Sequence, residues 1–297
     1  MDSNVMESGT SVGAEHLLII DKDQFRQNFN KRHFTLQHRL TGHPLLALPR
    51  LLELARDTAQ KRPNDLYYDT GVTDIDEKWG QRPLAFPVDE TIRRIESAGA
   101  WIALKGAEQD PAYAKLLDDC MSDLLEVSGR DLERNMRRKE VIVFITSPGR
   151  LTTYHIDSEC NFLLQVQGTK VISIFRPDDR EVLPEEEIEA FWTNSRNAAQ
   201  YKPQLQDHAD EVKLGPRDGV HIPINAPHWV RNGDEISIAV SINYHSYGNE
   251  RANIYRMNYF IRKMGLKPTP PFQSPVQDFV KRRVGSAVMA LRGKAGK

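Results

Sequence analysis

Residues Thr152 to Lys170 read Thr-Thr-Tyr-His-Ile-Asp-Ser-Glu-Cys-Asn-Phe-Leu-Leu-Gln-Val-Gln-Gly-Thr-Lys. Within this stretch His155 and Asp157 stand two positions apart in a segment that is typical of a β-strand. Residues two apart in a strand point to the same face of the sheet, so one metal ion can bind both side chains. An isolated His-x-Asp pair more often marks a polar strand end that faces solvent.

Further strands are predicted around this pair. After residue 140 the chain contains seven short segments that are rich in Val, Ile, Thr and Phe and are separated by Gly, Pro or Asp: 141–146, 151–157, 162–166, 170–176, 212–214, 220–223 and 235–245. No helices alternate with them, so we expect a mainly β fold with flanking helices (α+β), in which antiparallel strands form a sandwich or barrel. The polar stretch 177–210 is a long insertion that is typical of a lid or binding loop, or contains a short surface helix at 185–192.

Helical periodicity dominates the residues before the strands. Apolar side chains share one face over 44–59 and over 110–125, and 63–87 is expected to be loop with a possible short strand. The tail from Pro275 is helical by period and basic. We therefore expect four parts: a disordered leader at 1–14, a mostly helical N-terminal region at 15–140 packed on the barrel, the barrel itself at 141–250, and a C-terminal helical segment at 251–297.

Composition excludes several classes of protein. The 297 residues include 40 basic and 41 acidic ones, so no overall field attracts nucleic acid or an acidic membrane. Only two cysteines, Cys120 and Cys160, are present, which is too few for a disulfide framework or a cysteine zinc cluster. No apolar run approaches the roughly 20 residues of a membrane span, and no signal peptide is evident. We expect a cytoplasmic protein.

A third potential metal ligand is His228, in the run His221-Ile-Pro-Ile-Asn-Ala-Pro-His-Trp-Val. A strand that ends at Pro223, a proline-marked turn and a new strand from His228 bring this side chain to the mouth of the barrel, near His155 and Asp157. Two histidines and one carboxylate leave about three octahedral positions open, which is typical of non-haem Fe(II) oxygenases. His221 is the competing third ligand.

Two further features indicate a ligand inside the barrel. Lys170 shares a strand face with Ile172 and Ile174, and an inward-facing lysine needs an anion unless its ammonium reaches water. Ser237, Ala239, Ser241 and Asn243 form one small, polar face of the last strand, opposite Ile236, Ile238, Val240 and Ile242. If the small face points inward, it leaves room for a ligand; otherwise it is a solvent face.

These residues resemble the JmjC group of cupin-fold oxygenases, which depend on Fe(II) and 2-oxoglutarate, and most nearly the asparaginyl hydroxylase of the hypoxia-inducible factor. The likeness covers about residues 141–247 and implies a double-stranded β-helix, that is, a cupin or jelly-roll barrel. It implies His155, Asp157 and His228 as iron ligands. It also implies that Lys170 binds the far carboxylate of 2-oxoglutarate, and that Thr152, Asn161 and Asn243 contact this cosubstrate.

Two positions depart from the resemblance. Strict alternation places Thr153, and not Thr152, on the face of His155, so the assignment of Thr152 requires a bulge in the strand. His245 stands where the hydroxylase has an aromatic residue beside the pocket.

The resemblance implies a dioxygenase that uses O2 and 2-oxoglutarate to hydroxylate a protein side chain, a peptide or a small metabolite. The alternatives are an N-methyl demethylase and a metal-binding cupin without oxygenase activity, either an isomerase or a sensing module. We expect no nucleic-acid or membrane partner. The basic, amphipathic C-terminal helix favours packing or a homodimer.

Overall fold

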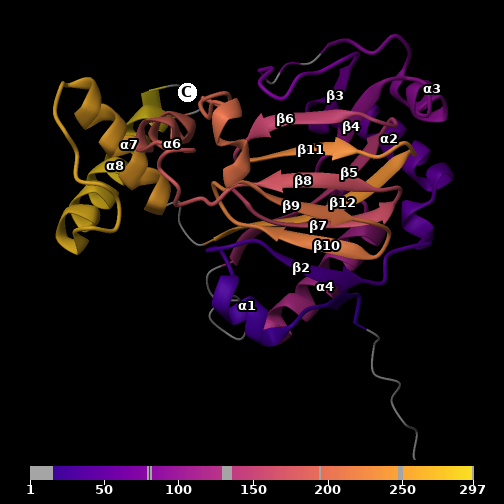
Figure 1. Cartoon of the computed structure of the whole chain (residues 1–297), viewed down its shortest axis with the longest axis horizontal. Helices are drawn as coiled ribbons and strands as arrows, with labels where there is room; N and C mark the ends of the chain where they lie inside the picture. Colours follow the sequence, from indigo (N-terminus) through magenta and orange to yellow (C-terminus); the bar gives the residue numbers. More distant parts are fainter. Residues whose placement is uncertain are drawn as a thin grey trace, which may run out of the picture.

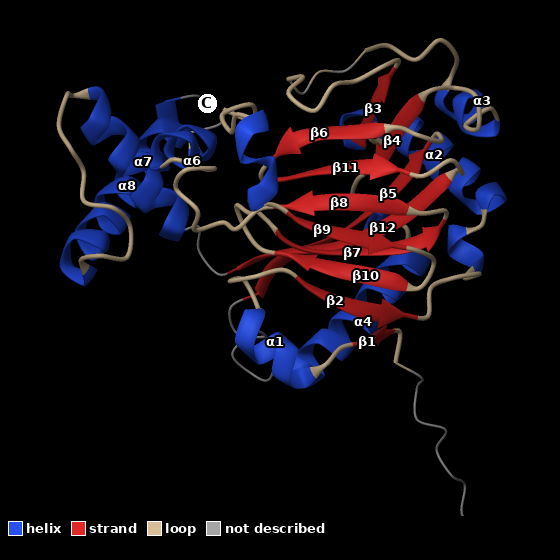
Figure 2. Cartoon of the chain, in the orientation of Figure 1, coloured by secondary structure: helices blue, strands red, loops and turns tan. Residues whose placement is uncertain are grey.

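Two antiparallel sheets face each other in the computed structural model, and helices cover the outer side of the larger sheet and one end of the sandwich (Figure 1, Figure 2). The structure describes residues 16–78, 80, 82–128, 136–193, 195–246 and 250–295. The expected leader at residues 1–14 lies outside them. The predicted mainly β fold with flanking helices is confirmed, and the two facing sheets have the jelly-roll architecture.

The larger sheet has the strand order β1-β2-β10-β7-β12-β5-β4-β3, and the smaller sheet has the order β6-β11-β8-β9. The bounds are β1 Leu18–Ile19, β2 Phe34–His38, β3 Leu66–Thr70, β4 Ala100–Leu104, β5 Met136–Thr146, β6 Leu151–His155, β7 Cys160–Gln167, β8 Lys170–Ile174, β9 Asp210–Leu214, β10 Asp218–Ile222, β11 His228–Asn232 and β12 Ser237–Ser246. All seven predicted strand segments are present. The main difference is that β5 begins five residues earlier than expected, while β7, β9 and β10 each begin two residues earlier.

The two faces of β12 have different surroundings. Ile238, Val240 and Ile242 belong to a large apolar cluster that β12 shares with α2 (Leu48–Lys61) and α4 (Pro111–Ser128) on the outer face of the sheet. Ala239 packs with residues of β8 between the sheets, and Ser241 is fully buried there. The small, polar face of β12 therefore points into the sandwich and not toward solvent.

Strands as well as helices come from the region before residue 140. The strands β1 and β2 extend one edge of the larger sheet, while β3 and β4 extend the other next to β5. The described helices of this region are α1 (Lys22–Asn28), α2, α3 (Val88–Arg93) and α4. All five residues of β4 are buried, so this strand lacks the alternation that identifies a strand in a sequence. The N-terminal region is thus continuous with the sandwich, and the expected boundary at residue 140 falls inside β5.

The two predicted helices of this region form, with one shift. Helix α2 begins at Leu48, after a separate 3-10 turn at Pro44–Leu46. Pro49 has no amide hydrogen to donate and therefore fits only the first helical turn, which sets this later start. Asp110 caps α4, because its Oδ1 accepts a hydrogen bond of 2.9 Å from the amide of Ala112.

The insertion contains a helix that packs on the C-terminal helices. Helix α6 (Glu185–Trp192) contacts α7 (Glu250–Lys263), and α7 packs on α8 (Pro275–Ala295). Arg262 of α7 donates hydrogen bonds of 2.9 and 3.0 Å to the fully buried carboxylate of Glu189 in α6. These helices lie together at the end of the sandwich where β6 ends and β11 begins (Figure 1). None of the described helices has the length and apolar character that a membrane span requires.

In the turn after β7, Gly168 lies very close to the backbone just before β12, and a substitution at this glycine tests whether the fold depends on that approach. Gly168 has a φ of +70°, and a Cβ at this position would lie 2.4 Å from the carbonyl oxygen of Ile236. Gly168→Ala should lower the free energy of unfolding by about 2–4 kcal/mol, because left-handed backbone and a steric clash act together. Gly42→Ala is the control, since Gly42 has a φ of +76° and no heavy atom within 4 Å of its Cβ position. Urea unfolding should show a smaller loss for the control, and equal losses would contradict the explanation.

Candidate metal centre

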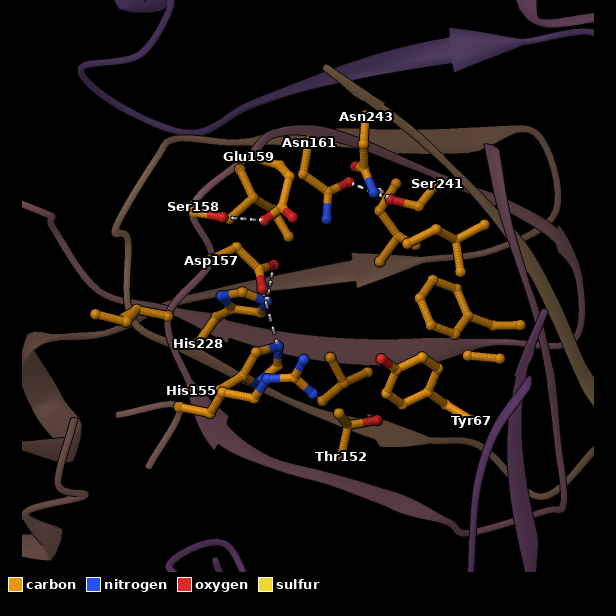
Figure 3. Close-up of a pocket in the computed structure, with 18 of the residues that line it drawn as sticks. Tyr67, Thr152, His155, Asp157, Ser158, Glu159, Asn161, His228, Ser241 and Asn243 are labelled. Atoms are coloured by element: carbon orange, nitrogen blue, oxygen red, sulfur yellow. Dashed lines mark hydrogen bonds and ion pairs between the residues drawn. The ribbon is translucent and has the colours of Figure 1, made fainter. Parts of the chain in front are cut away.

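Three potential metal ligands meet at one end of the smaller sheet (Figure 3). His155 is the last residue of β6 and pairs directly with His228, the first residue of β11. Asp157 follows β6, with its Oδ1 4.0 Å from Nε2 of His155 and its Oδ2 3.8 Å from Nε2 of His228. One ligand atom from each residue lies within 4.8 Å of the others. Groups at this spacing can bind a single ion and leave other coordination positions open.

Backbone carbonyls orient both imidazoles. Nδ1 of His155 is 2.7 Å from the carbonyl oxygen of Thr153, and Nδ1 of His228 is 3.0 Å from that of Ala226. When each Nδ1–H donates to its carbonyl, the Nε2 lone pairs remain available on the side of Asp157. Burial, and to a smaller extent the neighbouring His155, lowers the pKa of His228 to about 3. This imidazole is therefore neutral at neutral pH, which metal binding requires.

A cavity of about 1010 Å³ extends from the three side chains into the space between the sheets. Lys170, the first residue of β8, contributes to its lining. Along β8, Lys170 is four residues from Ile174, the cross-strand partner of His228, which corresponds to about 13 Å of backbone. Lys170 and the two histidines thus lie at different depths of the same cavity.

Lys170 is buried, with only 6% of its surface exposed. Among the described residues, no carboxylate lies within ion-pair distance of its ammonium, and burial lowers the pKa of Lys170 to about 8. A buried cation without a partner is unfavourable, so the site is suited to an anion that enters the cavity.

Hydrogen-bond donors from the larger sheet face the same space (Figure 3). Asn161 and Asn243 are cross-strand partners, and the hydroxyl group of Ser241 lies 2.6 Å from Oδ1 of Asn161 and 2.9 Å from Oδ1 of Asn243. In the described part of the chain, the two amide nitrogens donate to no protein acceptor. They are therefore available to donate to a ligand in the cavity.

The same part of the chain matches a known family. The family model of the Cupin-like domain matches residues 62–250. This chain belongs to the Cupin-like domain family. No curated protein sequence matches that of this chain.

Solved structures of the ribosomal oxygenase YcfD from Escherichia coli have a similar fold. One has a TM-score of 0.54 at 13% identity, over 93% of this chain and 68% of that chain. Another, a complex with cobalt and 2-oxoglutarate, has a TM-score of 0.52 at 15% identity, over 93% and 68% of the two chains. These similarities confirm the predicted cupin barrel.

His221 of this cupin is not close to the other three candidates. Its Nε2 accepts a hydrogen bond of 3.1 Å from the amide of Asn30, and its Nδ1 lies 3.1 Å from the carbonyl oxygen of Asn161. The ring stacks on Phe29 and packs against Phe34 on the outer face of the larger sheet. Both ring nitrogens are therefore occupied by protein groups, which leaves His228 as the third ligand that the geometry favours.

The strand β6 contains the irregularity that the assignment of Thr152 requires. His228 pairs with His155, but Val230 pairs with Thr152, so β6 has one extra residue between these two pairs. As a result Thr152 lines the cavity together with His155. His245 is not among the described residues that line the cavity, and its Nε2 lies 3.7 Å from Oε1 of Glu159.

Several cavity residues could not be identified from the sequence. Tyr67 and Trp101 come from the N-terminal strands, Arg196 comes from the insertion, and Arg256 comes from α7. They lie outside residues 141–246 in the chain or inside the insertion, and strand pairing and helix packing bring them to the cavity. No local motif marks them.

Metal titration tests the candidate ligands. The protein should bind one Co(II) ion, and His155→Ala or His228→Ala should weaken binding by more than about a hundredfold, because losing even an outer partner of a ligand costs about 10–100-fold. His221→Gln should bind Co(II) within about threefold of the unaltered protein. Visible absorption of bound Co(II) is the measurement. Loss of the metal in His221→Gln, with circular dichroism unchanged, would contradict the assignment.

Proposed function

We propose that this cupin is an Fe(II)- and 2-oxoglutarate-dependent oxygenase, most simply a hydroxylase. The observation that carries the proposal is the combination, in one cavity, of an open set of two histidines and one carboxylate with a buried lysine that has no acidic partner in the described part of the chain. The set has nitrogen and oxygen donors only, which suits Fe(II). The cobalt and 2-oxoglutarate in one YcfD structure, and the cobalt and succinic acid in another, support it.

Each residue has a defined role in this proposal. His155, Asp157 and His228 would hold the ion, and Lys170 would bind the far carboxylate of the cosubstrate through a charge-assisted hydrogen bond. Asn161 and Asn243 would donate hydrogen bonds to it. When bound, the iron supplies the activation of O2, coupled to conversion of 2-oxoglutarate into succinate and CO2.

The protein itself contributes orientation and exclusion of water. The carbonyls of Thr153 and Ala226 fix both imidazoles, so the ligands are in place before an ion arrives. Apolar side chains such as Phe144 and Leu163 line the inner part of the cavity and keep the cosubstrate away from bulk solvent. A cupin without oxygenase activity has no use for an inward-facing lysine, so this alternative is less consistent with the site.

A protein side chain is the substrate that we propose first. The name ribosomal oxygenase given to YcfD supports this class. The volume of about 1010 Å³ also exceeds what a five-carbon cosubstrate fills, which leaves room for a side chain to enter.

We also propose that α7 and α8 bind a second copy of this chain. Of the ten large hydrophobic side chains that are exposed in the described residues, seven lie in this helical hairpin: Met264, Leu266, Phe272, Val276, Phe279, Val280 and Val284. A concentration of exposed apolar side chains in one segment is typical of an interface. The hairpin lies at the side of the molecule away from the sandwich (Figure 1), so a second copy can reach it.

Anaerobic titration tests the cosubstrate assignment. The Fe(II) protein should develop a metal-to-ligand charge-transfer band with 2-oxoglutarate and release succinate once O2 is admitted. Lys170→Met should raise the Kd for 2-oxoglutarate about 30–150-fold, as expected for the loss of about 2–3 kcal/mol from one charge-assisted pair. The control is Lys213→Met on the neighbouring strand β9, where the side chain is exposed. Absence of the band at saturating 2-oxoglutarate would overturn the proposal.

Light scattering during size-exclusion chromatography tests the dimer. Val276→Asp combined with Val280→Asp places two charges on the exposed face of α8 and should convert a dimer into a monomer at micromolar concentration. Val72→Asp is the control, since Val72 is exposed elsewhere. A monomeric unaltered protein, or a double variant that stays dimeric, would contradict the proposal.

A further inference from the structure

Arg256 of α7 lines the cavity without an acidic partner. Its Nε donates a hydrogen bond of 2.8 Å to the carbonyl oxygen of Trp192, and its Nη1 donates one of 3.0 Å to Oδ1 of Asn253. Among the described residues, no carboxylate lies within ion-pair distance of this guanidinium. Other partly buried arginines do have one, as Arg150 has Asp69 and Arg262 has Glu189.

A second arginine reaches the same cavity from the insertion. Arg196 follows α6, is exposed, and has its guanidinium carbon 5.9 Å from the ring centroid of Tyr67 in β3. This cation–π contact positions the side chain across the mouth, and no carboxylate among the described residues pairs with it. The two arginines therefore approach the cavity from different elements, and neither is neutralised by the protein.

The charges that line the cavity do not balance. Of its described lining residues, four are cationic, Lys105, Lys170, Arg196 and Arg256, and two are carboxylates, Asp157 and Glu159. A divalent ion adds two positive charges and a dianionic cosubstrate removes two, so the surplus of two remains when both are bound.

Of the four cations, the two arginines are those without an acidic partner among the described residues and without an assigned role at the cosubstrate. Lys105 lies 3.8 Å from the buried carboxylate of Glu140, which offsets its charge. Lys170 is the partner assigned to the cosubstrate. Glu159 accepts a hydrogen bond of 3.0 Å from Ser158 and lies 3.7 Å from His245, so it has local partners of its own and does not neutralise either arginine.

Arg256 is held at the metal end of the cavity. Ile156, between His155 and Asp157 in the sequence, packs in one apolar cluster with Trp192 of α6 and with Ala252 and Tyr255 of α7. Arg256 follows Tyr255 directly and is bound to the backbone of Trp192. A group bound by this arginine would therefore lie near the candidate metal ligands, whereas Lys170 lies deeper between the sheets.

We propose that the primary substrate carries an anionic group, a carboxylate or a phosphate, which Arg256 and Arg196 bind at the metal end of the cavity. The proposal rests on the proposed oxygenase function, because it assigns the substrate class of that same site. A guanidinium donates two parallel hydrogen bonds to either type of anion, which would fix the orientation of the substrate as well as its charge.

Binding of inorganic phosphate to protein loaded with Mn(II) and 2-oxoglutarate tests the inference without turnover. Because Mn(II) broadens the ³¹P resonance of a nearby phosphate, the unaltered protein should give saturable broadening. Arg256→Gln should raise the apparent Kd of phosphate about tenfold to a hundredfold, as expected for one lost hydrogen bond between charged groups. The double variant Arg196→Gln/Arg256→Gln should show no saturable broadening of the ³¹P resonance. Arg251→Gln is the matched control, since Arg251 is an exposed arginine of the same helix that is not among the described lining residues.

The outcomes separate this inference from the oxygenase proposal. If Mn(II) and 2-oxoglutarate bind but phosphate gives no saturable broadening, or if Arg256→Gln binds phosphate as the unaltered protein does, the inference is overturned and the oxygenase proposal stands. If Mn(II) or 2-oxoglutarate does not bind, the oxygenase proposal fails, and the inference with it.

Competition by acetate and by methyl phosphate ranks the two anion types, and stronger competition by either one assigns the class of the group. Succinate release without substrate should be the same in Arg251→Gln, the control outside the cavity, and in the unaltered protein.

Discussion

The direct pairing of His155 with His228 across β6 and β11 is the contact on which the site depends. Opposite residues in an antiparallel pair hold their side chains about 5 Å apart on the same face, and here the ring centroids are 4.2 Å apart. Asp157 needs to supply only a carboxylate within reach of both rings. The extra residue in β6 follows from the same arrangement, because it brings Thr152 to the cavity while His155 keeps its place opposite His228.

A cavity between two sheets has a structural consequence. The space that would hold the apolar core of an ordinary sandwich is partly lined by polar side chains such as Ser241 and Asn243, so the apolar cluster between the sheets is smaller than a fully apolar core would be. The larger apolar cluster instead lies between the outer face of the larger sheet and the helices α2 and α4. The N-terminal region is therefore necessary to the fold, since without it Ile238 and Val240 would face water.

The sequence predicted those parts of the site in which a chemically informative residue lies in a segment with a clear strand or turn pattern. Alternation identified the strands that bear His155 and Lys170, and the proline-marked turn placed His228 correctly at the start of a strand. Alternation of apolar and polar residues did not identify β4, because both faces of that strand are buried. In β6 alternation indicated the wrong threonine, because an extra residue changes which threonine faces inward. Pairing between distant strands decides both features. The two arginines at the cavity are marked by no local pattern, because distant contacts bring them there: Arg256 through the packing of α7 on α6, and Arg196 through Tyr67 of β3.

Two arginines of α7 illustrate how the structure distinguishes a stabilising charge from one available to a ligand. Arg262 and Arg256 are six residues apart on one helix, and both are bound to α6. Arg262 meets the buried carboxylate of Glu189, so its charge is satisfied within the protein. Among the residues that the structure describes, Arg256 meets a backbone carbonyl and a side-chain amide but no carboxylate, so the guanidinium is oriented without being neutralised. A partly buried guanidinium without a carboxylate partner is unfavourable for folding unless an anion binds to it. Such an anion can reach Arg256 through the cavity. The cavity thus has a cation at each end, Lys170 deep between the sheets and Arg256 at the helices, with the candidate metal ligands at the end that Arg256 shares.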